Sequence, residues 1–167
     1  MVTDERHFIH SMLRERIVEH VFVGDVLRVL WRRGVADVEI LRPEFDAHGY
    51  DVVMSRGPIV RHVQLKTQAA GRVSVGRALA EKPSGCVVWI GLNKDTLVLG
   101  PFMWFGGPPG EPLPDISQYS NPRRATHNSK GLRPARKNHH ELPAQAFTKL
   151  QTLDEVVERL FGELPAL

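Results

Sequence analysis

Residues 11–33 limit the fold of this chain more than any other stretch. They contain no proline and one glycine, which predicts a single long helix. Gly34, directly after Arg32 and Arg33, predicts where that helix ends. Apolar side chains cover most of its circumference, so the helix must be largely buried. These side chains are Ile17, Val18, Val21, Phe22, Val23, Val26, Leu27, Val29, Leu30 and Trp31.

Short apolar or alternating segments predict the strands that follow. The expected strands are residues 38–41, 50–55, 59–67 and 86–92. Residues 96–99 are expected to pair with the last of these as a hairpin, because Asn93, Lys94 and Asp95 form a turn signal between them. Residues 73–81 are ambiguous and could hold a short helix that ends before Pro83.

The chain is expected to end in a helix over residues 152–162. Thr152 and Glu155 have the spacing of a capping box, and Gly162 is a stop signal. The element order is therefore helix, three strands, an uncertain helix, a strand, a hairpin or loop extension, and a terminal helix. This order predicts a mixed α/β fold in one domain, residues 1–167, with its core at about residues 11–100.

Composition excludes several classes of protein. The 167 residues are 42% hydrophobic and 25% charged, as in ordinary globular domains. One cysteine excludes a disulfide framework and a cysteine-rich zinc module. No signal-peptide pattern and no apolar run of roughly 18 residues is visible, so we expect a cytoplasmic chain without a membrane partner. The net charge of +3 is compatible with a polyanionic partner.

Two short motifs carry the clearest chemistry, Gly49-Tyr50-Asp51 and Gln64-Leu65-Lys66. If residues 56–58 form the turn between two strands, Asp51 lies opposite Val63 or Gln64. Because side chains alternate along a strand, Gln64 and Lys66 share one face. A carboxylate, an amide oxygen and an ammonium group therefore converge on one patch.

Oxygen ligands of this kind suit Mg²⁺ or Mn²⁺. In a phosphodiester hydrolase, Asp51 would hold the metal, and Gln64 and the Leu65 backbone carbonyl would complete part of its shell. Lys66 would orient the attacking water and stabilise developing charge. A second carboxylate is needed, and Glu19 is the best candidate because it shares a helix face with Met12, Val23, Val26 and Leu30. Glu15 is the competitor.

These residues resemble the PD-(D/E)XK nuclease superfamily, in its prokaryotic Gly-x-Asp and Gln-x-Lys variant. The resemblance covers residues 14–99 and implies a restriction-endonuclease-like core of helix, three strands, helix and strand. It implies Glu19, Asp51 and Gln64 as metal-site residues and Lys66 as the catalytic lysine. Two features depart from the family: Gln64 stands where an acid is commoner, and residues 68–85 are short for the expected core helix.

Each of these residues also has a structural interpretation. Asp51 could cap a turn, and Lys66 could protect an edge strand from aggregation. Glu19 could pair with a nearby arginine, either Arg16 or Arg61. Phe102, Trp104 and Phe105 could stack on unpaired bases, but their spacing favours core packing. Cys86 is expected to be a buried, packed side chain.

Residues 121–140 form a basic segment without any acid. It could contact a phosphate backbone, or it could be a solvated surface loop. His127, His139 and His140 do not have the spacing of a metal site. The cations of the segment are Arg123, Arg124, Lys130, Arg133, Arg136 and Lys137.

The sequence therefore predicts a metal-dependent nuclease that hydrolyses DNA and needs no small organic cofactor. Cutting both strands would require a homodimer or sequential nicking. The alternatives are a catalytically inactive nucleic-acid-binding or partner-binding protein on the same fold, and a subunit that acts only within an assembly.

Overall fold

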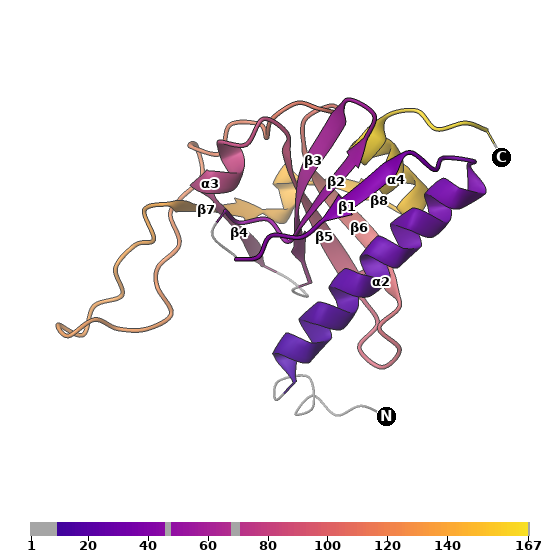
Figure 1. Ribbon diagram of the computed structural model, residues 1–167. Coiled ribbons are helices and arrows are strands. Elements are labelled where there is room, and N and C mark those ends of the chain that lie inside the picture. The colour runs from indigo at the N-terminus through magenta and orange to yellow at the C-terminus, as the bar shows by residue number, and fades with distance from the viewer. Residues whose placement is uncertain (1–9, 46–47, 68–70, 167) are drawn as a thin grey trace.

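The computed structural model describes residues 10–45, 48–67 and 71–166. Its elements are arranged around one large sheet (Figure 1). In chain order they are α2 (Ser11–Arg32), β1 (Val38–Leu41), β2 (Val52–Arg56), β3 (Ile59–Lys66), β4 (Arg72–Gly76), α3 (Arg77–Ala80), β5 (Gly85–Leu92), β6 (Leu99–Gly106), β7 (His139–Pro143), the 3-10 turn η1 (Ala144–Ala146), β8 (Thr148–Leu150) and α4 (Leu153–Phe161).

The large sheet has the strand order β1-β2-β3-β5-β6-β8. Strands β3 and β5 are parallel, and every other neighbouring pair in this sheet is antiparallel. A separate two-stranded sheet pairs β4 with β7, which lie far apart in the sequence. The predicted mixed α/β class is confirmed. The predicted core order of helix, three strands, helix and strand is present with one addition, because β4 of the second sheet lies between β3 and the short α3.

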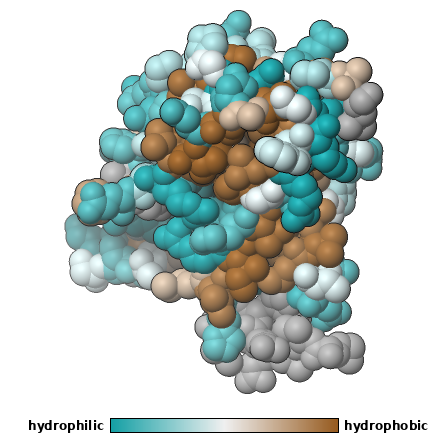
Figure 2. All heavy atoms as spheres, turned by 45° about the vertical axis from the view of Figure 1, so that its right-hand side comes forward, coloured by the Kyte–Doolittle hydropathy of each residue, from teal (hydrophilic) through white to brown (hydrophobic). Residues whose placement is uncertain are grey.

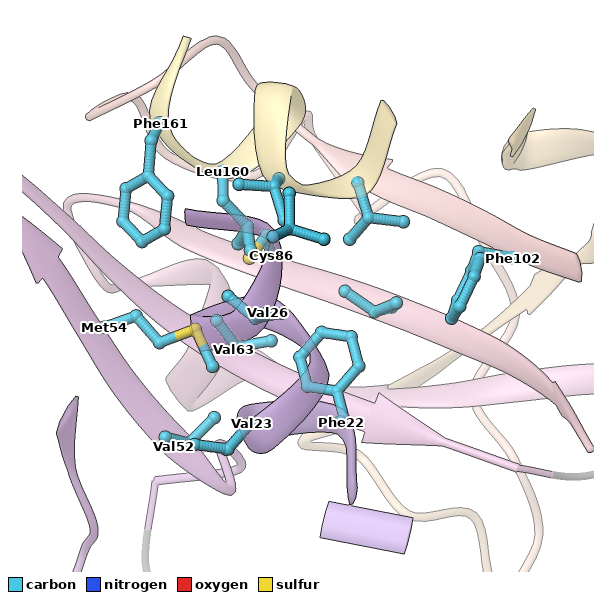
Figure 3. Close-up of a cluster of buried hydrophobic side chains, with 14 of the residues drawn as sticks. Phe22, Val23, Val26, Val52, Met54, Val63, Cys86, Phe102, Leu160 and Phe161 are labelled. Carbon is cyan, nitrogen blue, oxygen red and sulfur yellow. The ribbon is translucent and has the colours of Figure 1, made fainter. Parts of the chain in front are cut away.

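Two hydrophobic clusters pack against opposite faces of the large sheet. The first joins α2 and α4 to the sheet, and Figure 3 shows Phe22 and Val26 of α2 close to Val63 and Cys86 of the strands. The second joins the β4–β7 sheet and α3 to side chains of β5 and β6, among them Trp89 and Phe105. Period-two alternation explains the division, because Val88 belongs to the first cluster and its neighbours Val87 and Trp89 to the second.

Sequence predictions for the helices are largely confirmed. Helix α2 covers the predicted stretch, and α4 begins at Thr152 with both hydrogen bonds of the capping box. The ambiguous residues 73–81 divide between β4 and the four-residue α3. Within the residues that the structure describes, no helix is long and apolar enough to cross a membrane.

The predicted strand at residues 96–99 is wrong in position. Residues 95–98 lie in the connection after β5, and the strand that pairs with β5 is Leu99–Gly106. Phe102, Trp104 and Phe105 are buried on this strand, which confirms their predicted packing role. The prediction that Met12 lies on the buried apolar face of α2 is also wrong, because Met12 is 80% exposed. Figure 2 shows hydrophobic patches of this kind between hydrophilic ones on the surface of the molecule.

Arg61 of β3 is the largest fully buried side chain of the described core. Its guanidinium donates hydrogen bonds to the carbonyl oxygens of Leu160 (3.0 Å), Arg159 (2.9 Å), Gly107 (2.9 Å) and Glu111 (3.3 Å). It also lies over the Trp104 ring, 5.4 Å from the ring centroid. Arg61 therefore connects the sheet to the end of α4 and does not pair with Glu19, so that suggested pairing is wrong.

Candidate functional site

Strands β2 and β3 form the predicted hairpin, with Val52 opposite Val63 and Arg56 opposite Ile59. Asp51 directly precedes β2, and its backbone N–H donates to the Val63 carbonyl at 2.8 Å. The backbone N–H of Leu65 donates to Asp51 Oδ2 at 2.6 Å. The Asp51 carboxylate is thereby anchored to β3, between Gln64 and Lys66 in the sequence.

A hollow of about 580 Å³, here called the Asp51 hollow, lies between α2 and the ends of these strands. Glu19 of α2, Asp51, Leu65 and Lys66 all line it. The structure therefore places residues of α2, of the segment directly before β2 and of β3 on one hollow. Glu15 lines the same hollow.

Gln64 lines a different hollow of about 630 Å³, here called the Gln64 hollow. Lys66 lines both hollows, so they adjoin at this residue. The Gln64 side chain has its Oε1 atom buried with no hydrogen-bond partner, and the residue is only 8% exposed. The buried Ser74 Oγ, on the same hollow, also has no hydrogen-bond partner. Other polar residues of the lining are Arg77, Glu81, Arg136, Asn138 and His139.

Glu19 is 6% exposed, and two arginines neutralise it. Arg16 donates to Oε2 at 2.9 Å, and Arg42 donates to Oε1. The structure therefore contains the ion pair between Glu19 and Arg16 that the sequence analysis offered as a structural alternative. Arg42 was not predicted, because its contact with Glu19 joins the end of β1 to α2 and no local sequence pattern reports such a pairing.

The Gln64 hollow is electropositive. His139, at its wall, has a lowered pKa, first because of its partial burial and then because of Arg136, Lys66 and His140. Arg136 Nη2 lies 2.9 Å from His139 Nε2. Arg77 is partly compensated by Glu81 at 3.2 Å. Such a hollow suits an anionic ligand.

The oxygen donors on the Asp51 hollow fit a divalent cation in chemical kind. Carboxylate and carbonyl oxygens are the ligands that Mg²⁺ and Mn²⁺ prefer. Asp51 and Leu65 line this hollow, whereas both oxygens of Glu19 accept hydrogen bonds from arginines. In the described part of the chain, no group of three or more His, Cys, Asp or Glu residues is placed to hold a metal ion.

The basic segment extends from the body of the molecule as a long excursion before β7 (Figure 1). Arg123 and Ala135 form an isolated β-bridge near its base, and Asn128 Oδ1 accepts the backbone N–H groups of Lys130 and Leu132 at its turn. All six predicted cations of the segment are exposed. Arg136 alone among them lines the Gln64 hollow.

No protein-family model matches this chain, and no curated protein matches it in sequence. Among solved structures, the chain is similar to Hjc, a Holliday junction resolvase from the archaeal hyperthermophile Archaeoglobus fulgidus. The TM-score is 0.45 and the identity 12%, over 83% of this chain and 98% of that chain.

Proposed function

We propose that the protein is a metal-dependent nuclease of the PD-(D/E)XK type that cuts DNA. One observation carries the proposal: Glu19, Asp51, Leu65 and Lys66 line a single hollow although they come from α2, from the residue before β2 and from β3. An acid and a lysine on adjoining strand ends, beside a second acid, provide the groups that phosphodiester hydrolysis requires.

The residues of the Asp51 hollow would have different roles in the reaction. Asp51 and the Leu65 carbonyl would hold a Mg²⁺ or Mn²⁺ ion, which when bound supplies a polarised phosphate and an ionisable water. The Leu65 N–H keeps the Asp51 carboxylate in place through its 2.6 Å hydrogen bond. Lys66 stabilises the negative charge that develops on the phosphate and positions the attacking water. Glu19 would contribute as a ligand once its hydrogen bonds to Arg16 and Arg42 are exchanged.

The basic segment supports a nucleic-acid substrate. Its exposed arginines and lysines can neutralise phosphates, and such contacts give affinity without reading the base sequence. DNA as the substrate class follows the family resemblance. Arg123, Arg124, Lys130, Arg133 and Lys137 would contact the backbone away from the cut.

A plasmid-nicking assay tests the proposal. We expect nicking in Mg²⁺ or Mn²⁺ and none in EDTA. Asp51→Asn keeps an acceptor for the Leu65 N–H but removes the charge, and Lys66→Ala removes the cation; each should lower the rate at least about 100-fold. The exposed control variants Glu158→Gln and Lys149→Ala should retain the full rate. Nicking that persists in EDTA, or in both site variants, would contradict the proposal.

A catalytically inactive DNA-binding protein is the second candidate, and the hydrogen bonds from Arg16 and Arg42 to Glu19 favour it. Titration calorimetry with Mn²⁺ separates the two. Metal binding that Asp51→Asn abolishes supports the nuclease. Salt-sensitive DNA binding by a chain that binds no metal and does not nick supports the inactive binder.

A further inference from the structure

We propose that the Gln64 hollow holds one nucleotide of the DNA strand, with its base edge against Gln64. This inference rests on the proposed function for its substrate. It differs from the sequence expectation for Gln64, because it makes that amide a contact to the base and not a metal ligand.

The buried amide of Gln64 is the first support. A buried acceptor without a partner is costly, so native structures rarely retain one unless a ligand or water satisfies it. Oε1 of Gln64 is such an atom, and the residue is more than nine-tenths buried. Ser74 Oγ is a second unpartnered atom on the same hollow, and it can donate as well as accept.

The chemistry of the ligand follows from the rest of the lining. An orphaned acceptor requires an N–H donor, while Lys66, Arg136 and Arg77 favour an anion. A nucleotide provides both, since its base edge carries amino groups and its phosphate is negative. Gln amides pair in this way with the N6 and N7 atoms of adenine.

Size and position agree with this ligand. The hollow has about 630 Å³, within the usual range for small-molecule sites. It adjoins the Asp51 hollow at Lys66. A strand that places one phosphate at Lys66 can therefore direct the neighbouring nucleotide toward Gln64.

Calorimetry in EDTA with the whole chain tests the site without cleavage. We expect 2′-deoxyadenosine 5′-monophosphate to bind at least tenfold more tightly than 2′-deoxyribose 5-phosphate. Gln64→Met should abolish this difference and leave the sugar phosphate affinity unchanged, and Ser74→Ala should reduce it. Arg136→Ala should weaken both ligands alike, whereas Lys149→Ala, exposed on β8, should change neither.

Equal binding of the two ligands, or a difference that survives in both Gln64→Met and Ser74→Ala, would overturn the inference. Because no metal or turnover is involved, failure here is distinct from failure of the nicking assay. A protein that nicks DNA but does not prefer the nucleotide would retain the proposed function and lose this site.

Discussion

Arg61 and Gln64 lie three residues apart on the same strand and are both buried, but they differ in whether their polar atoms have hydrogen-bond partners. Arg61 donates to four backbone carbonyls and lies over an aromatic ring. Gln64 has a buried oxygen with no hydrogen-bond partner. Because one position is odd and the other even, their side chains are on opposite faces of β3.

The difference separates stability from function. On the face toward α4, the buried Arg61 finds hydrogen-bond acceptors within the chain, which is how a folded protein avoids the cost of desolvation. On the face toward β4 and β7, the chain leaves an acceptor unsatisfied inside an electropositive hollow. A buried acceptor without a partner is expected at a site where a ligand completes the hydrogen bonds.

Removing Arg61 should have the largest effect on stability. Arg61→Met leaves carbonyls of Leu160, Arg159 and Gly107 without donors and should lower the free energy of unfolding by about 3–5 kcal/mol. Urea unfolding followed by circular dichroism measures this loss. The control Arg56→Met, which removes a 3.5 Å surface pair with Asp37, should cost less than about 1 kcal/mol. Equal losses would show that the Arg61 contacts do not stabilise the fold.

A substitution at the N-cap of α4, the helix that accepts hydrogen bonds from Arg61, should have a smaller effect on the free energy of unfolding. Thr152 Oγ1 accepts the Glu155 N–H at 3.3 Å as the N-cap of α4, whose last turn carries two of the four Arg61 acceptors. Thr152→Ala should cost about 1 kcal/mol. The exposed Thr148→Ala should cost less than about 0.5 kcal/mol in the same urea experiment. A Thr152 effect no larger than the Thr148 effect would contradict a role for the cap.

Local patterns predicted the hairpin side of the site well. The turn at residues 56–58 and strict alternation were sufficient to bring Asp51 close to Lys66. The displaced strand β6 was missed because Pro101 and Gly100 interrupt it, and such residues normally argue against a strand.

The division into two hollows was not predictable from local patterns. It depends on the pairing of β4 with β7, which are more than 60 residues apart, and on Arg42 reaching Glu19 across 23 residues. Contacts over such separations leave no periodic signal in the sequence. The sequence therefore indicated which residues carry the chemistry, but not that Gln64 would line a separate hollow.

The electropositive Gln64 hollow should also make the free energy of unfolding depend on pH. The pKa of His139 is lowered, so the folded chain binds this proton less tightly than the unfolded chain, whose pKa is near 6.5. The stabilisation is present above pH 6.5 and is lost as the pH falls through the lower folded pKa. Burial and Lys82 lower the pKa of His62 in the same direction.

Urea unfolding at pH 7.5, 6.5 and 5.5 measures this dependence. We expect the free energy of unfolding to fall between pH 6.5 and 5.5, and His139→Gln to reduce the fall. His127→Gln, exposed on the basic segment, should leave it unchanged. A steeper fall in the His139 variant would show that the sign is wrong.

Gln64→Met should produce the smallest change in stability and thereby sharpen the contrast with Arg61. The substitution keeps the shape of the side chain and removes a buried acceptor that has no partner, so the free energy of unfolding should stay within about 0.5 kcal/mol or rise. The nicking rate should nevertheless fall at least about tenfold, while the exposed Gln145→Met changes neither quantity. If Gln64→Met instead destabilises the chain as much as Arg61→Met, Gln64 is a structural residue whose partner is part of the fold. The two faces of β3 would then differ only in which groups satisfy them.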